Sequence, residues 1–147
     1  MTTRDELSES EENKGDHTKL MRAALEGNTA TVSMLLAGGT DINAKDSEGR
    51  TALMFAVINM HADATTELLE HGADVNATAN DGGTALMLAA SSGDTESVRA
   101  LLSKGADIGN RYSQSGETAL MLAEKNNHTD IVELLSGGRS HTAKSNS

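Results

Sequence analysis

The sequence predicts an all-α solenoid, a stack of short repeats that each fold as a helix-turn-helix pair. The first observation is a recurring four-residue motif: residues 51–54, 84–87 and 118–121 all read TALM, and residues 18–21 read TKLM. These copies begin at residues 18, 51, 84 and 118, so the period is 33, 33 and then 34 residues. The second observation is that each copy is followed by apolar residues at helical spacing. A fixed period in this range is typical of repeat architectures, in which the units stack to make one continuous core.

Composition limits what this core can contain and which sites the chain can build. The 147 residues are 37% hydrophobic, which is enough for one domain, but Phe55 and Tyr112 are the only aromatic residues. The core must therefore consist mainly of Leu, Ala, Val and Met side chains. The sequence contains no cysteine, which excludes a disulfide framework, a zinc–thiolate site and a thiol nucleophile.

The formal net charge of −10 bears on the choice of partner. Binding to nucleic acid depends on Lys and Arg side chains that neutralise phosphates, so no nucleic-acid partner is expected. A basic or neutral protein partner fits the charge better, although acidity that only keeps the protein soluble explains it equally well. Six acidic residues lie in residues 1–16, which we interpret as an acidic flexible tail. The chain has no apolar run that fits a signal peptide or a membrane span, so we expect a cytoplasmic protein with no membrane partner.

The third copy shows how one repeat is built. Apolar residues stand at positions i, i+3 and i+4 in two successive segments, Leu86-Ala89-Ala90 and Val98-Leu101-Leu102. This spacing predicts two short amphipathic helices in each copy. Two helices of this length cannot bury their apolar faces alone, so the copies are expected to stack.

Turn residues mark the ends of these helices. Thr84 precedes the first helix, where its hydroxyl can accept a hydrogen bond from a free backbone N–H, and Asp94 is placed to cap the second helix in the same way. Gly93 lies between the helices and suits a left-handed helix end because it lacks Cβ. His61 and His128 stand at the position of Asp94 in other copies, which predicts a turn or capping role for them.

A polar run follows each of the first three helix pairs. It begins at Gly39-Thr40-Asp41, Gly72-Ala73-Asp74 and Gly105-Ala106-Asp107, and it continues through further Gly and Asn residues to the next Thr. Such a run has turn chemistry and no helical period. We therefore expect extended, β-hairpin-like fingers that join one helix pair to the next.

Taken together, these signals resemble the ankyrin repeat. They run in the order Thr-x-Leu-x-x-Ala-Ala, Gly, a Val/Leu-rich helix, Gly-Ala-Asp-x-Asn-Ala and Asp-x-x-Gly-x-Thr, over residues 18 to about 136. The resemblance implies a single ankyrin-repeat domain, residues 17–137, followed by a flexible C-terminal tail, residues 138–147. Its repeats would span about residues 17–45, 46–78, 79–111 and 112–137. The family's Pro and His are replaced throughout, by Lys19, Ala52, Ala85 and Ala119 and by Met21, Met54, Met87 and Met121.

Two repeats depart further from the pattern. In the second repeat, Met60 occupies the Gly position and Glu67 a position that is usually apolar, so this repeat is predicted to be the least stable. Glu67 serves either the fold or a partner. In the fourth repeat, Glu124 replaces the second Ala of the pair and Ser136 the last Leu, which makes the outer face more polar and closes the stack.

Nothing in the sequence has the pattern of a catalytic or metal site. Five histidines are scattered over the copies and tails without HExxH spacing, and the sequence has no GxSxG, P-loop or GxGxxG motif. The paired Asp residues recur at turn positions, where Asp bonds to the backbone. We therefore predict no enzyme activity, no cofactor and no metal, and we regard a small-molecule receptor as the least favoured class.

The resemblance implies a protein-interaction module whose concave face is made by the fingers and the exposed side of the first helix of each pair. Its role would be that of an adaptor, inhibitor or immunity-type protein, acting as a monomer. The alternative is a scaffold whose acidic N-terminal tail is the working part. Carried over position by position, the partner-binding residues are Lys45, Ser47, Glu48, Arg50, Ile58, Asn59, Asn80, Asp81, Ser91, Ser92, Tyr112, Gln114, Ser115, Glu117, Lys125 and Asn126, with Thr78, Gly83, Leu25 and Glu26 beside them.

Two of these residues are expected to anchor the partner. Tyr112 belongs to a residue type that is enriched in binding hot spots, and it lies in the finger that carries the extra residue of the 34-residue period. Ile58 is a β-branched residue expected at the surface beside Phe55 and Met60. We expect Ile58 and Tyr112 to bracket the contact patch.

Overall fold

The computed structural model describes residues 17–145, with side chains described as far as residue 137. The predicted acidic tail, residues 1–16, lies outside the described part of the chain. Residues 146–147 lie outside it as well.

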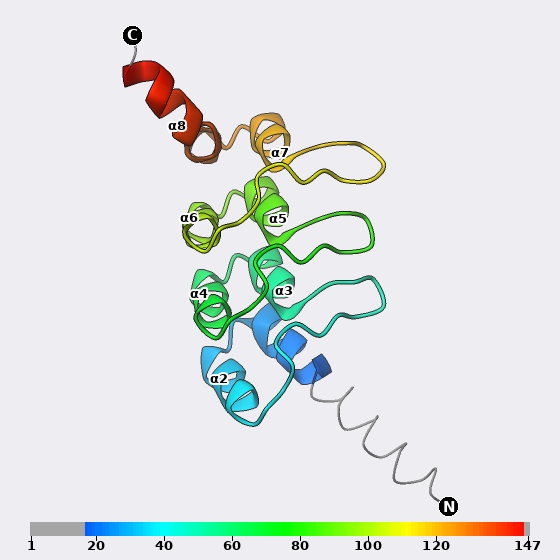
Figure 1. The fold of residues 1–147 in the computed structure, drawn as a ribbon. Helices are drawn as coiled ribbons and strands as arrows, with labels where there is room; N and C mark the ends of the chain where they lie inside the picture. The colour runs from blue at the N-terminus through cyan, green and yellow to red at the C-terminus, as the bar shows by residue number, and fades with distance from the viewer. Residues whose placement is uncertain (1–16, 146–147) are drawn as a thin grey trace, which may run out of the picture.

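Helices are the only regular secondary structure of the described residues, and they form four hairpins stacked side by side (Figure 1). An inner layer contains the first helix (residues 17–26), α3 (Ala52–Ile58), α5 (Ala85–Ser92) and α7 (Ala119–Lys125). An outer layer contains α2 (Thr29–Ala37), α4 (Ala62–Glu70), α6 (Thr95–Ser103) and α8 (Thr129–Ser145). Fingers leave the inner layer and point away from the outer one (Figure 1). The predicted all-α solenoid of helix pairs joined by fingers is confirmed.

A threonine begins three of the inner helices, as predicted. The hydroxyl oxygens of Thr51, Thr84 and Thr118 accept hydrogen bonds from the backbone N–H groups three residues later, at 3.4, 3.3 and 3.2 Å. Each threonine has extended backbone angles, so the chain turns from the finger into the helix at this residue. The recurring Thr is therefore a helix N-cap that satisfies a donor the helix itself leaves free.

A left-handed residue separates the two helices of every hairpin. Gly27 and Gly93 have φ values of 73° and 83°, and Met60 and Asn127 occupy the same position with 60° and 61°. After Gly93, the Oδ1 atom of Asp94 accepts the backbone N–H of Ser97 at 3.2 Å, which confirms the predicted cap. At Met60 an L side chain is held in a region that costs about 1–2 kcal/mol, whereas glycine enters it freely.

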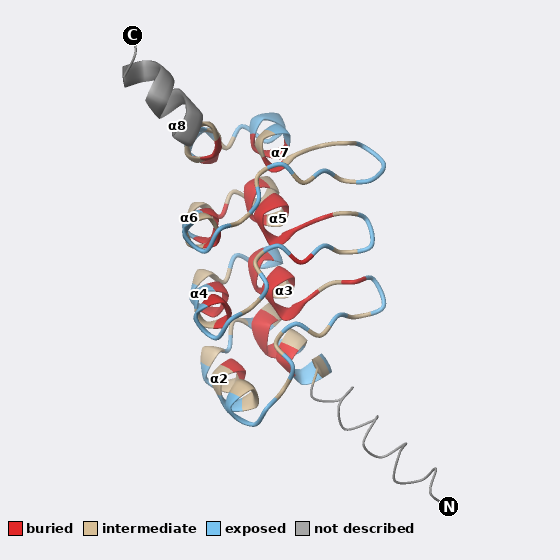
Figure 2. Cartoon of the chain, in the orientation of Figure 1, coloured by how far each residue is buried: buried red, intermediate tan, exposed pale blue. Residues whose placement is uncertain are grey.

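The core runs through all four repeats along the facing sides of the two layers, where Figure 2 shows the buried residues. The leucine and methionine of the recurring TALM motif fill the core in the middle of the stack, where Met54 and Met87 are only 1% exposed. Valine, leucine and isoleucine of the outer layer meet them, and Val32, Leu68, Leu101 and Ile131 are buried completely. Each fully buried side chain of this size contributes about 1.5–3 kcal/mol.

The unusual residues of the second repeat are accommodated within its fold. Helix α4 is as long as α2 and α6 at nine residues, and Thr65 is fully buried within it. The carboxylate of Glu67 accepts a hydrogen bond from the hydroxyl of Ser33 in the first repeat, and its Oε2 atom lies 3.6 Å from Nδ1 of His71. Glu67 thus joins two repeats, which gives it a place in the fold. That the second repeat is the least stable one stays a prediction.

The C-terminal end of the stack is only partly covered. Met121, the counterpart of Met54 and Met87, is 44% exposed, because no helix pair among the described residues packs over it. Glu124 is exposed, and the Ser136 hydroxyl donates to the carbonyl oxygen of Val132, so polar side chains do lie at this end. Helix α8 reaches Ser145, within the segment assigned above to a C-terminal tail, and that assignment stays a prediction.

Candidate functional site

Each finger is a short loop closed by backbone hydrogen bonds. In the first finger (residues 39–51), the Asp46 N–H donates to the Arg50 carbonyl at 2.9 Å, and the Gly49 N–H donates to the Asp46 carbonyl at 3.0 Å. In the second finger (residues 72–84) the Ala79 N–H donates to the Gly83 carbonyl and the Gly82 N–H to the Ala79 carbonyl. In the third finger (residues 105–118) the Tyr112 N–H donates to the Glu117 carbonyl and the Gly116 N–H to the Tyr112 carbonyl. Each fingertip is therefore a turn that ends at a glycine, and Asp46, Ala79 and Tyr112 hold the first position of the three turns.

The fingers are also tied to one another. The Asn80 N–H donates to the Glu48 carbonyl at 2.9 Å, and the Ser113 N–H donates to the Asp81 carbonyl at 2.8 Å. Side chains add two further ties, from Asn80 Nδ2 to the Ser47 carbonyl at 3.1 Å and from Lys45 Nζ to the Thr78 carbonyl at 2.9 Å. The three fingertips are thus joined in one row, and this ties Lys45 and Asn80 to the fold as well as to the surface.

Two asparagines at the ends of inner helices also join neighbouring repeats. Asn59 Nδ2 donates to the Leu25 carbonyl at 2.8 Å, and Asn126 Nδ2 donates to the Leu122 carbonyl at 3.0 Å and to Ser91 at 3.4 Å. The sequence pattern alone gives these positions no packing role. The contact is missed at that level because it joins residues 34 or 35 positions apart, and no local pattern reports it.

Arg50 is held by partners of its own repeat. Its Nε atom lies 2.9 Å from Asp46 Oδ2, its Nη1 atom lies 3.5 Å from Glu48 Oε2, and its guanidinium lies 5.0 Å from the centre of the Phe55 ring. Burial opposes ionisation of Asp46, but hydrogen bonds from the Arg50 backbone and side chain outweigh it, so the pKa of Asp46 is lowered. The charge of Arg50 is therefore already balanced within the protein.

A hollow of about 180 Å³ opens between the fingers and the inner helices. Ile58, which is 36% exposed, lies in its wall, and so does Tyr112. The Tyr112 ring packs against Gly83 so closely that a Cβ on Gly83 would lie 2.8 Å from a ring carbon. Three repeats contribute to this one hollow, whose lining residues are Glu48, Arg50, Met54, Ile58, Ala79, Asp81, Gly83, Leu88 and Tyr112.

The phenol of Tyr112 lies in a negative environment. Burial of the phenol, and then the charges of Asp81 and Glu117, raise the pKa of Tyr112 above its usual 10.0. Glu117 has a cation beside it, since its Oε2 atom lies 3.3 Å from Lys125 Nζ. Asp81 accepts the Gly83 N–H at 2.9 Å and forms no ion pair with any residue between 17 and 137.

The remaining predicted positions surround this hollow or lie beyond it. Gln114 is exposed near the tip of the third finger, and the neighbouring Ser115 hydroxyl accepts the Glu117 N–H at 3.2 Å. Ser91 and Ser92 are half-buried at the end of α5. In the first helix Glu26 is exposed, whereas Leu25 is half-buried and gives its carbonyl to Asn59.

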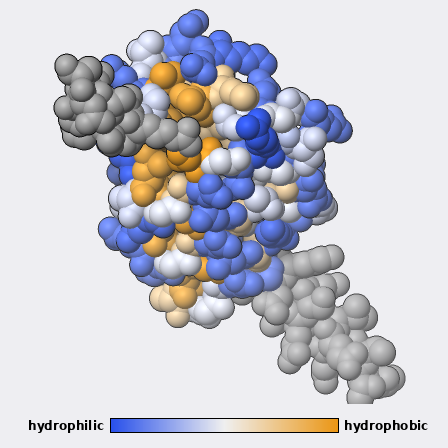
Figure 3. All heavy atoms as spheres, turned by 45° about the horizontal axis from the view of Figure 1, so that its top comes forward, coloured by the Kyte–Doolittle hydropathy of each residue, from blue (hydrophilic) through white to orange (hydrophobic). Residues whose placement is uncertain are grey.

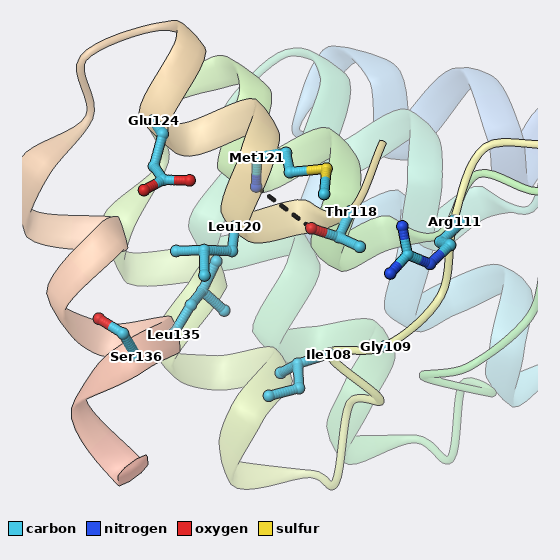
Figure 4. A pocket seen from close by; sticks show the side chains of 9 residues that line it. All are labelled: Ile108, Gly109, Arg111, Thr118, Leu120, Met121, Glu124, Leu135 and Ser136. Carbon is cyan, nitrogen blue, oxygen red and sulfur yellow. Dashed lines mark hydrogen bonds between the residues drawn. The ribbon is translucent and has the colours of Figure 1, made fainter. Parts of the chain in front are cut away.

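A second hollow, of about 300 Å³, lies at the C-terminal end of the stack and was not predicted (Figure 4). Ile108, Leu120 and Leu135 form its apolar part, with Arg111 and Glu124 at its edge. Apolar side chains also gather at this end in the space-filling view (Figure 3). Glu124 and Ser136 were expected to close this end with polar groups, but Met121 is 44% exposed and leaves apolar surface open there.

Two histidines, His61 and His128, lie at the turns between the helices of a pair. His61 begins α4 without a side-chain cap bond, and His128 lies 3.1 Å from the Ser91 carbonyl through its Nε2 atom. Among residues 17–137 no group of three or more His, Cys, Asp or Glu side chains is placed to hold a metal ion. No helix described here is both long enough and apolar enough to cross a membrane.

Comparison with known proteins places this fold in a family. The family model for ankyrin repeats, which describes three copies, matches residues 20–112 and again residues 78–146. The search of curated proteins finds no match. Ankyrin repeats are in general protein-interaction modules and are typically not enzymes. Because the two matches cover most of the chain, the protein belongs to the ankyrin-repeat family.

Proposed function

We propose that this protein binds a partner protein through its concave face, meaning the three fingertips and the exposed side of the inner helices. In this proposal it acts as an adaptor, an inhibitor or an immunity-type protein, as a monomer in the cytoplasm and without catalysis of its own. The observation that carries the proposal is the hollow in which Ile58, Asp81 and Tyr112 meet from three consecutive repeats.

The backbone bonds between the fingers support this proposal. Backbone bonds link the second finger to the first and the third finger to the second, so the tips keep their spacing before any partner arrives. Binding then costs little additional ordering of the chain, which favours affinity. Exposed side chains such as Gln114 remain available for contact at the tips.

The charge of the chain supports a basic partner. At a net charge of −10, long-range attraction would speed the encounter with a positively charged surface. Such attraction is screened by salt, so the rate of association should fall as ionic strength rises.

The test is an affinity capture from cells of the source organism at low and moderate salt. We would compare the wild type with a concave-face variant carrying Ile58→Ala, Tyr112→Ala and Gln114→Ala. The matched control carries Thr66→Ala, Glu70→Ala and Arg99→Ala, which lie exposed on the outer layer and leave the net charge unchanged. Circular dichroism during heating would show that both variants fold.

A partner that the concave-face variant loses and the control variant keeps supports the proposal. A partner that both variants retain equally contradicts it. Deletion of residues 1–14 tests the alternative, because loss of the partner on that deletion would assign the function to the acidic tail.

A further inference from the structure

The hollow between the fingers has the size of one side chain. Its volume of about 180 Å³ is below the roughly 300–1,000 Å³ typical of small-molecule pockets. Its deeper walls are apolar, with Met54 buried on α3 and Leu88 half-buried on α5. Ile58, which is 36% exposed, and the half-buried Tyr112 also line it. An aliphatic side chain would bury its surface here without leaving a polar group unpaired.

The rim of the hollow carries one acidic group, Asp81, that forms no ion pair with any residue between 17 and 137. Arg50 is the only cationic residue in the lining, and it is already bonded to Asp46 and close to Glu48. Glu117 has Lys125 beside it. Asp81 uses Oδ1 to accept the Gly83 N–H, and its Oδ2 atom has no partner among residues 17–137. The rim is therefore complementary to a single positive charge.

Resting on the proposed function, we propose that the partner inserts an aliphatic side chain into this hollow and places a neighbouring Lys or Arg against Asp81. The two contacts act together, since the aliphatic group excludes water from the carboxylate and strengthens its attraction to the cation. The same arrangement rejects a segment with an acidic residue at that place, because it would bring like charges together. The partner is thus recognised by an aliphatic–basic pair within one short segment.

A library of random peptides displayed on phage provides the probe. Peptides selected on the wild-type protein are expected to share Leu, Ile, Val or Met beside Lys or Arg. The strongest binder would be synthesised, and its affinity measured against Ile58→Asp and Asp81→Asn. Asparagine keeps the oxygen that accepts the Gly83 N–H, so Asp81→Asn removes the charge and leaves the turn. Glu70→Gln, an equal change of charge on the outer layer, is the matched control.

We expect Ile58→Asp to weaken binding at least about tenfold and Asp81→Asn to weaken it about threefold to tenfold, with Glu70→Gln unchanged. A double-mutant cycle isolates the charge contact. Replacing the peptide's basic residue with Gln should cause the same loss on the wild type, and almost none on Asp81→Asn. High salt should reduce the difference in affinity between the wild type and Asp81→Asn.

Three results would overturn the inference. The first is a set of selected peptides that lack the aliphatic–basic pair. The second is a peptide affinity that neither Ile58→Asp nor Asp81→Asn changes. The third is a selection that yields no specific binder. Peptides lost on Tyr112→Ala and Gln114→Ala but indifferent to Asp81→Asn would refute this recognition chemistry and leave the concave face as the binding surface. Failure of the capture experiment would instead refute the proposed function itself.

Discussion

The imidazole of His128 lies directly against Gly93 of the preceding repeat, where a Cβ would come within 2.6 Å of the ring carbon Cε1. His61 lies against Gly27 in the same way, at 2.5 Å from its Nδ1 atom. Between the second and third repeats both partners differ, with Met60 at the glycine position and Asp94 at the histidine position. A histidine ring is thus found where the facing residue is glycine, and the smaller Asp94 is found where the facing residue is Met60.

Replacing Gly93 with alanine should therefore destabilise the protein for two reasons. The residue has a φ of 83°, where an L side chain costs about 1–2 kcal/mol, and the new methyl group would also displace the His128 ring. Gly105→Ala is the matched control, because Gly105 has a φ of 87° and open space around its Cβ position. We expect urea unfolding to show a clearly larger loss for Gly93→Ala than for Gly105→Ala. Equal losses would mean that the contact with His128 is not restrictive.

Replacing Met60 with glycine should stabilise the second repeat. Its φ of 60° is strained for methionine, and its side chain is 50% exposed, so little packing is lost. Relief of about 1–2 kcal/mol is opposed by the greater freedom of glycine in the unfolded chain, about 0.4–1 kcal/mol, which leaves a net gain of up to about 1.6 kcal/mol. Thermal unfolding should show a higher Tm. Asn127→Gly should gain less, since asparagine tolerates this conformation, and an equal or larger gain there would contradict the explanation.

Removing the Asp94 side chain should cost more than an ordinary surface change. Asp94 is buried, and its carboxylate accepts both the backbone N–H and the hydroxyl of Ser97. We expect Asp94→Ala to reduce the free energy of unfolding by about 1–2 kcal/mol, as for other lost N-caps. Asp63→Ala, at an exposed site in the first turn of α4, should change it much less. Similar values for the two variants would argue against the cap.

The single tyrosine gives a direct measure of the charge around the hollow. Because the chain has one Tyr and no Trp, ultraviolet absorbance during an alkaline titration reports Tyr112 alone. The pKa of Tyr112 should lie above 10.0 in the folded protein and near it in the urea-unfolded chain, since burial and then Asp81 and Glu117 oppose the phenolate. Asp81→Asn should lower the midpoint of the folded protein. An unchanged midpoint would mean that Asp81 exerts no field on the phenol.

The same raised pKa sets the sign of a stability change at high pH. The unfolded chain loses the Tyr112 proton first, so ionisation favours unfolding as pH rises. The contribution of Tyr112 should be constant below about pH 9 and should be lost as pH rises past 10.0 toward the higher pKa of the folded state. Tyr112→Phe should lack this component of the alkaline loss of stability in urea unfolding.

Local features are readable from the sequence, and contacts between repeats are not. Thr84 and Asp94 are identifiable as caps and Gly93 as a left-handed turn, because each acts on residues only a few positions away. The bond from Asn59 to Leu25 and the one from Ser33 to Glu67 depend on how repeats are stacked, and no short motif encodes this. Exposure and residue type single out Ile58 and Tyr112 separately, whereas the hollow between them follows from the stacking of three repeats.

The methionines differ widely in burial, so their rates of oxidation can report how often neighbouring repeats separate. Met34, Met60 and Met121 are 66%, 50% and 44% exposed, so mild peroxide should convert them rapidly to sulfoxides. Met54 and Met87 are sealed between repeats and can react only when a junction opens. The rates of sulfoxide formation at these two residues, read by mass spectrometry, would thus report how often each inner junction of the array comes apart in the native protein.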